Sequence, residues 1–274
     1  MDLRKLGGIV SLSFLAAGSI FLPRDSIASG EAQDFDGSVQ LIDRESCNDM
    51  KRRNVLSRVF SSCERLRLVR FSYINFQGET KNDGSVVVLD AAAHQVLMVF
   101  DDLRRAHFPI EKANLMNAYN GIDDLSMNDN NTSSFNDRTI AGSKRISMHA
   151  YGAAIDINPK INPFVVHTGK RDIVKPASGS GYVDRSAQSP GMAEPVREIF
   201  ANHGFIIWGG DWRNPIDYQH FQLSRDLAER LIALPADKAR EYFENYVLAY
   251  RKCMAEAGER HGAAATRCGG RAVN

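Results

Sequence analysis

The stretch SMHAYGAAIDIN, residues 147–158, joins a histidine to a predicted strand that contains an acid. Apolar residues at every second position of 153–157 predict a short strand with one apolar face. A carboxylate in such a strand is unfavourable unless it is paired or bound to a metal, so Asp156 needs a partner. His149 lies seven residues earlier, and Gly152 lets the backbone turn so that both side chains can converge. We therefore expect two ligands of one zinc ion here.

A second stretch, WGGDWRNPIDYQHFQ, residues 208–222, again places an acid and a histidine beside strand-like aromatic residues. For a single histidine beside an apolar strand, a hydrogen-bonded core residue is the commoner explanation. The repeated pairing favours a metal site instead, with His149, Asp156 and His220 as ligands. Three protein ligands are typical of a catalytic zinc, which keeps a fourth position for water and lowers the pKa of that water to about 7.

Asp217 is the candidate general base, because a carboxylate beside an activated water can take its proton. In an extended strand, positions three apart point to opposite faces about 10 Å apart, so this role requires a bend within residues 216–219. Pro215 makes such a bend plausible. Asp217 is therefore expected to approach the site only through a turn.

Two further polar side chains are candidates for substrate contacts. Arg138, eleven residues before His149, could stabilise an oxyanion, although any single arginine is more often a surface residue. The hydroxyl of Ser147 could bond a substrate group or cap the turn that follows it. Both roles are left open by the sequence.

The N-terminus has the pattern of an export signal. Arg4 and Lys5 precede an apolar run over 6–22, and small residues at 26 and 28 suit a cleavage site, which predicts a signal peptide over 1–28. An uncleaved anchor is the alternative, since the run is near the lower limit for a membrane span. We expect a periplasmic or secreted protein with no stable membrane span after processing.

Charge and cysteines narrow the class of protein further. The chain has 34 basic and 33 acidic residues, and removal of 1–28 takes away three basic and two acidic ones, so no net charge remains and no nucleic-acid partner is expected. The cysteines form two local pairs, Cys47 with Cys63 and Cys253 with Cys268. In an exported protein they favour two disulfides, although three connectivities are possible. A cysteine metal site is disfavoured because no CxxC spacing occurs.

The chain divides into an N-terminal leader and helix at 29–65, a zinc core at 66–224 and a helical extension at 225–274. Helical spacing from residue 50 to 63 predicts a helix, across which Cys47 and Cys63 could not join unless it breaks near Asn48.

Within the predicted core, strands are expected at 66–76, 86–89, 111–119, 205–208 and 220–223, and helices after Asp90 and at 196–204. The Asp- and Asn-rich segment 121–131 is expected to be a loop, without the ligand spacing of a calcium loop. The last helix is predicted at 236–257. These elements indicate an α+β fold with a small antiparallel sheet and flanking helices.

The pattern S-x-H-x-x-G-x-A-x-D over 147–156, followed by WGGDW at 208–212 and D-x-x-H-F at 217–221, resembles the bacterial D-alanyl-D-alanine carboxypeptidase family. The chain is most similar to the branch that includes phage L-alanyl-D-glutamate endopeptidases, because NTSSFNDR at 131–138 and GGDW match that branch too. The resemblance covers roughly residues 71–222.

This resemblance implies one zinc ion and cleavage of peptidoglycan stem peptides, as a carboxypeptidase or an endopeptidase. It implies His149, Asp156 and His220 as zinc ligands, Asp217 as the general base, and Arg138 as the contact to the substrate carbonyl. The sequence departs from many carboxypeptidases by placing Asp rather than Glu at the base position, which leaves Asp211 as a second candidate for the base.

A different class of function shares this wider architecture. Hedgehog signalling domains are thought to keep the zinc fold without hydrolysis, so a non-catalytic binding module is the alternative. Asp217 and Arg138 favour the enzyme, because a pure binder needs no base near the metal. The expected protein is a monomer whose partners are peptidoglycan peptides.

Overall fold

The computed structural model describes residues 37–258 and 263–273, so the expected signal peptide lies outside the described residues. The strands are β1 (Ser38–Leu41), β2 (Leu66–Ile74), β3 (Thr80–Leu89), β4 (Ala154–Asp156), β5 (Phe164–Val166), β6 (Ile173–Lys175), β7 (Ile207–Trp208), β8 (Ile216–Asp217) and β9 (His220–Gln222). The α-helices are α1 (Arg44–Arg52), α2 (Ala93–Arg105), α3 (Asp123–Asn128), α4 (Arg197–Asn202), α5 (Arg225–Ala233), α6 (Ala236–Ala257) and α7 (Ala263–Val273).

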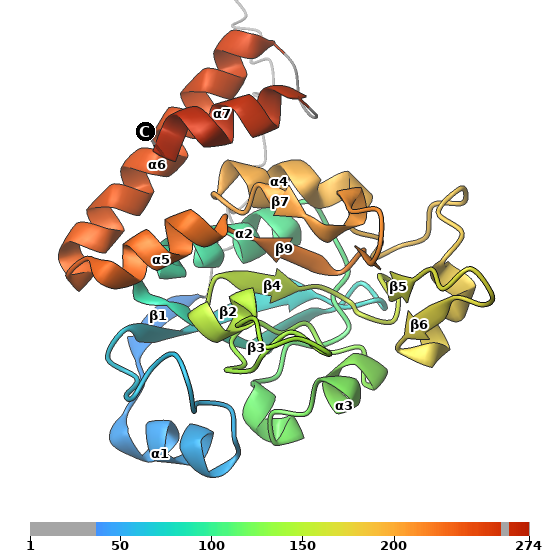
Figure 1. Ribbon diagram of the computed structural model, residues 1–274, viewed down its shortest axis with the longest axis horizontal. Helices are drawn as coiled ribbons and strands as arrows, with labels where there is room; N and C mark the ends of the chain where they lie inside the picture. The colour runs from blue at the N-terminus through green and yellow to red at the C-terminus, as the bar shows by residue number, and fades with distance from the viewer. Residues whose placement is uncertain (1–36, 259–262, 274) are drawn as a thin grey trace, which may run out of the picture. The chain divides into compact units, whose positions relative to one another are not determined.

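Short 3-10 helices connect these elements: η1 (Asp90–Ala92), η2 (Met116–Tyr119), η3 (Met148–Tyr151), η4 (Ala177–Tyr182), η5 (Glu194–Val196) and η6 (Gly209–Asp211). The described strands form small antiparallel sheets in the orders β1-β2-β3, β4-β9-β7 and β6-β5-β8. Figure 1 shows these sheets among the helices. The predicted α+β class with small antiparallel sheets and flanking helices is confirmed.

The sheet β1-β2-β3 contributes to the core: β2 covers residues 66–74 of the strand expected at 66–76 and pairs with β3, with a shift in register between Phe71 and Tyr73. Helix α2 packs on β2, and the rings of Phe71 and Phe100 stack with their centroids 3.6 Å apart. The sheet β4-β9-β7 extends this core, because Phe221 of β9 stacks on Phe200 of α4 at 3.8 Å. This second sheet is the one that carries the candidate metal ligands.

The helix expected over residues 50–63 is wrong in its extent. Helix α1 ends at Arg52, and Asn54 takes a positive φ of 58° that does not continue a helix. Val55 and Leu56 are buried from an irregular segment rather than from a helix face. Because α1 ends early, the chain turns back and Cys47 forms a disulfide with Cys63. The second expected disulfide, Cys253–Cys268, is also present.

The strand expected at 111–119 is also wrong, since this segment has only isolated bridges before η2. The side-chain amide of Asn131 takes the place of a strand partner: its Oδ1 accepts from the Asn114 N–H at 2.7 Å and its Nδ2 donates to the Asn114 carbonyl at 3.0 Å. The segment expected as a loop at 121–131 contains α3. The first error arises because a side-chain amide, rather than a neighbouring strand, forms the hydrogen bonds of the Asn114 backbone.

The C-terminal helices follow the expected pattern. Ser224 caps α5 by accepting a hydrogen bond from the Leu227 N–H, and α6 covers the predicted residues 236–257. The disulfide Cys253–Cys268 joins α6 to α7, and Figure 1 shows these two helices side by side. No helix within the described residues is both long and apolar enough to cross a membrane.

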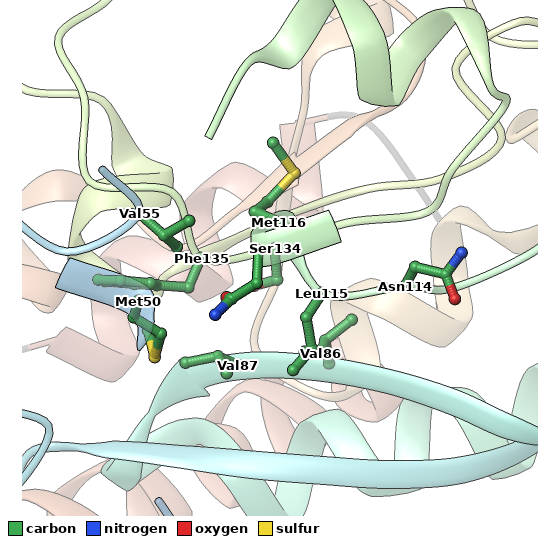
Figure 2. Close-up of a pocket in the computed structure, with 10 residues that line it drawn as sticks. Met50, Val55, Val86, Val87, Asn114, Leu115, Met116, Ser134 and Phe135 are labelled. Atoms are coloured by element: carbon green, nitrogen blue, oxygen red, sulfur yellow. The ribbon is translucent and has the colours of Figure 1, made fainter. Parts of the chain in front are cut away.

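A small cavity of about 10 Å³ lies between β3 and the segments on either side of it. Figure 2 shows Val86 and Val87 on the strand, with Met50, Val55 and Phe135 grouped at one end of the space. This volume is close to the smallest that can hold a water molecule.

Candidate metal centre

Three side chains from separate segments meet at one point in the β4-β9-β7 sheet. Asp156 ends β4, His220 begins β9, and the two residues are directly opposite one another in the antiparallel register. His149 lies on η3, which the positive φ of Gly152 ends before β4 begins. A side chain at Gly152 would meet the Leu89 backbone nitrogen at 2.5 Å, so only glycine allows this close turn.

The donor atoms of this cluster lie within 4.8 Å of one another, and all three residues are buried. The Nε2 atom of His149 is 3.2 Å from Oδ2 of Asp156 and 3.2 Å from Nδ1 of His220. Two ligand atoms about 2.0–2.1 Å from a tetrahedral zinc lie about 3.3 Å apart. The spacing of these donors therefore suits a zinc ion.

Hydrogen bonds on the outer side of each ring decide which nitrogen faces the cluster. The Nδ1 atom of His149 lies 2.6 Å from the Ser134 carbonyl oxygen, which can only accept, so Nδ1 carries the proton and donates it. The Nε2 atom of His220 donates to Oε1 of Gln222 at 2.8 Å, and the Gln222 amide donates to the Leu223 carbonyl, which fixes its orientation. Each ring thus offers its other nitrogen to the cluster, as metal ligands do.

The charges inside the cluster also suit a cation. Burial raises the pKa of Asp156, but the charges and hydrogen bonds of His149 and His220 outweigh burial and hold that pKa well below its usual range. Burial lowers the pKa of His220, yet the hydrogen bond to Asp156 and the charges of Asp156 and Asp217 raise it to about 9. The cluster therefore attracts positive charge at neutral pH. Two imidazole nitrogens and a carboxylate oxygen are a donor set that zinc accepts.

Asp217 reaches this region through the bend that its expected role requires. Strand β8 ends at Asp217, and Tyr218 and Gln219 form a turn before β9. A side chain at Gly209 would lie 2.5 Å from the Asp217 carbonyl oxygen, so a glycine there lets β8 approach η6. Burial first, and then the charge of Asp156, raise the pKa of Asp217 to about 6. This carboxyl can therefore gain and lose a proton near neutral pH.

Gln219 holds the Asp217 carboxylate and was missed by the sequence analysis. Its Nε2 donates to Oδ1 of Asp217 at 3.1 Å, and the side chain is only 2 % exposed. The Gln219 Oε1 atom is buried without a hydrogen-bond partner. No periodicity distinguishes this residue, although its place between two candidate site residues was a usable signal.

The expected substrate contacts lie in less direct positions. Arg138 forms an ion pair with Asp123, and its side chain is 32 % exposed. The Ser147 hydroxyl accepts a hydrogen bond from the His149 N–H at 3.3 Å and so caps η3. Asp211, the second candidate for the base, pairs with Arg197 at 2.5 Å and is 58 % exposed. Of these residues, only Ser147 contacts a candidate ligand directly.

Comparison with known proteins gives one match. A family model described as D-alanyl-D-alanine carboxypeptidase matches residues 141–223. The matched segment contains His149, Asp156, Asp217 and His220 but not Arg138. This match supports that family and supports a peptidase. No curated protein and no solved structure matches the chain significantly.

Proposed function

We propose that this protein is a zinc-dependent peptidase that cleaves peptidoglycan stem peptides. The observation that carries the proposal is the paired orientation of His149 and His220, each donating outward and presenting its second nitrogen toward Asp156. A buried cluster built in this way, within a segment that matches a peptidase family, suits a catalytic metal better than a core hydrogen-bond network. The two disulfides fit an exported protein that works at the cell wall.

The chain's own residues would divide the chemistry as follows. When bound to His149, Asp156 and His220, zinc supplies a Lewis acid that activates water and polarises the substrate carbonyl. Asp217, as general base, would take a proton from the attacking water and pass it to the leaving amine. Gln219 keeps the Asp217 carboxylate oriented by its hydrogen bond. The raised pKa of Asp217, about 6, suits a group that must exchange protons near neutral pH.

Two residues are proposed as substrate contacts. Ser147 accepts a hydrogen bond through its oxygen, so its O–H remains able to donate to a substrate oxygen. Arg138 would contact the substrate carbonyl, which requires that its guanidinium exchange the Asp123 carboxylate for substrate. Whether the scissile bond is a terminal D-Ala bond or an internal L-Ala–D-Glu bond depends on how these side chains meet the peptide.

The test is incubation of the purified protein with defined muropeptides, followed by mass analysis of the products. We expect loss of D-Ala or release at the L-Ala–D-Glu bond, abolished by a chelator and restored by added zinc. A metal-loaded protein that binds muropeptides but releases no product would instead identify a non-catalytic binding module. A protein that takes up no zinc would contradict both proposals.

A further inference from the structure

Asp137 is a buried carboxylate that the proposed chemistry does not use. It is 2 % exposed, and its Oδ2 accepts hydrogen bonds from three consecutive backbone N–H groups, those of Ser57, Arg58 and Val59. The bonds from Ser57 and Val59 are each 2.9 Å long. Three convergent N–H donors are a strong way to stabilise a buried anion, so this contact is a specific clamp.

The clamp holds a segment that has no regular structure of its own. Residues 53–65, between α1 and β2, contain neither helix nor strand, and the disulfide Cys47–Cys63 closes the loop. The backbone adds two further bonds, because the Asp137 N–H donates to the Val55 carbonyl at 2.9 Å and the Ser57 hydroxyl donates to the Asp137 carbonyl at 3.2 Å. The loop and Asp137 are therefore joined through both side chain and main chain.

Asp137 belongs to the segment 131–138, which forms hydrogen bonds with two residues of the candidate metal centre. The backbone N–H and carbonyl of Ser133 exchange hydrogen bonds with those of Asp156, at 2.9 and 2.8 Å. The Ser134 carbonyl accepts from His149 Nδ1 at 2.6 Å, and the Asn136 N–H donates to the His149 carbonyl at 3.3 Å. Two of the three candidate ligands thus depend on the position of this segment.

The segment 131–138 is not a strand of any sheet, so its position relies on separate anchors. One anchor is the bond from the Phe135 N–H to the Val87 carbonyl at 3.1 Å. Apolar packing is a second anchor, because Val55 and Phe60 of the loop are buried and the rings of Phe60 and Phe135 lie 6.2 Å apart. The polar contacts at Asp137 add hydrogen bonds between the loop and the segment to this packing.

We propose that Asp137 is a positioning residue that couples the Cys47–Cys63 loop to the metal centre. The disulfide orders residues 53–65, the backbone of 57–59 holds Asp137, and the segment 131–138 then presents the Ser134 carbonyl to His149. The inference rests on the proposed metal site and adds to it a structural requirement near the N-terminus. It predicts that the N-terminal disulfide matters for metal binding, whereas the C-terminal disulfide does not.

The experiment compares matched variants of the full chain by zinc affinity, measured in competition with a chromophoric chelator. Asp137→Ala, and separately the double variant C47S/C63S, should each weaken zinc binding about tenfold or more, because a shift of the segment 131–138 misplaces the Ser134 carbonyl that orients His149. Asp137→Asn keeps an acceptor oxygen and should recover most of the affinity. The cobalt-substituted Asp137→Ala protein should show an altered visible absorption spectrum, which a general loss of stability would not produce.

Two controls separate this role from ordinary stabilisation. Asp184→Ala removes another carboxylate that accepts a hydrogen bond from a backbone N–H, that of Ser186, away from the Cys47–Cys63 loop. C253S/C268S removes the other disulfide. Both controls should retain the wild-type zinc affinity even if they unfold at lower temperature. Should Asp137→Ala fail to fold, Asp137→Asn and C47S/C63S carry the comparison.

The outcomes distinguish this inference from the proposed function. If wild-type protein binds zinc and C47S/C63S binds it equally well, or if C253S/C268S weakens zinc binding to the same degree, the coupling is refuted. If the wild-type protein binds no zinc, the proposed metal site fails first. Weakened zinc binding confined to the Asp137 and Cys47–Cys63 variants would establish the coupling.

Discussion

The sheets β4-β9-β7 and β6-β5-β8 contribute different parts of the candidate site and differ in burial. All three residues of β4 are buried, whereas both residues of β8 are only half-buried and β6 begins at an exposed Ile173. Asp156 and His220 belong to the first sheet and Asp217 to the second. In the proposed mechanism, therefore, the residues that would hold the metal and the residue that would move a proton lie in separate sheets, so mutations should separate the two functions.

The largest loss of turnover is expected from a substitution in the sheet β4-β9-β7. His220→Ala should remove a candidate ligand and one of the two histidine contacts of Asp156, so that zinc is lost and muropeptide turnover falls on the order of 10⁴-fold or more. Elemental analysis of the folded protein and product analysis measure both losses. His94→Ala is the control, because His94 is exposed on α2, and it should keep both metal and turnover.

A smaller loss of turnover is expected from a substitution in the sheet β6-β5-β8. Asp217→Asn keeps the shape and the hydrogen bond from Gln219 but cannot take a proton, so kcat should fall about 10²- to 10⁴-fold. Zinc content should stay at the wild-type level, as measured by elemental analysis. Full turnover in this variant would remove Asp217 from the mechanism, and the equivalent change at Asp211 would then be the next to test.

A smaller effect is expected from the contact between η6 and β8. Gly209→Ala places a methyl group 2.5 Å from the Asp217 carbonyl oxygen and 2.8 Å from its Cβ, so β8 must shift. Displacing a catalytic group by a fraction of an ångström to 1 Å lowers kcat about 10- to 100-fold. Gly181→Ala is the matched control, because a Cβ there meets no atom within 4 Å. Equal turnover in the two variants would show that the close approach is not needed.

The smallest effect concerns stability and pH in the metal-free protein. The pKa of Asp217 is raised from 3.8 to about 6 in the folded state, so its ionisation opposes folding increasingly as pH rises between these values. Asp217→Asn should therefore raise the free energy of unfolding by up to about 3 kcal/mol above pH 6 and by little below pH 4. Urea unfolding at pH 4 and pH 7.5 in the presence of a chelator measures this difference. A gain that does not change with pH would contradict it.

Much of the fold could be predicted because its signals are local. The helix cap at Ser224, the long helix α6 and the strand β2 are each predicted by residues close to one another in the sequence. The errors at 50–63 and 111–119 have a common cause. In 50–63, the apolar residues are buried by contacts with distant parts of the chain, although their spacing resembles that of a helix. In 111–119, the Asn131 amide forms the hydrogen bonds that a neighbouring strand would otherwise form.

The candidate site was predictable in part for a similar reason. His149 and Asp156 lie on one short stretch with Gly152 between them, so their convergence could be inferred from local geometry. The roles of the Ser134 carbonyl and of Gln222 could not be assigned, because they depend on which side chain lies opposite them in space. Gln219 could have been suspected from its place between Asp217 and His220, but not its hydrogen bond to Asp217. The role of Arg138 as a substrate contact stays a prediction, since the structure pairs it with Asp123.

The sequence by itself determined which residue types are available for the proposed chemistry and many of the local elements that hold them, because strand alternation, helix caps and glycine turns act over a few residues. Only the tertiary structure decided that Asp156 faces His220 across two strands and that Asp137 accepts hydrogen bonds from the backbone of the Cys47–Cys63 loop. These pairings link residues far apart along the chain. They are fixed by the packing of whole elements and by the need of each buried polar group for a partner.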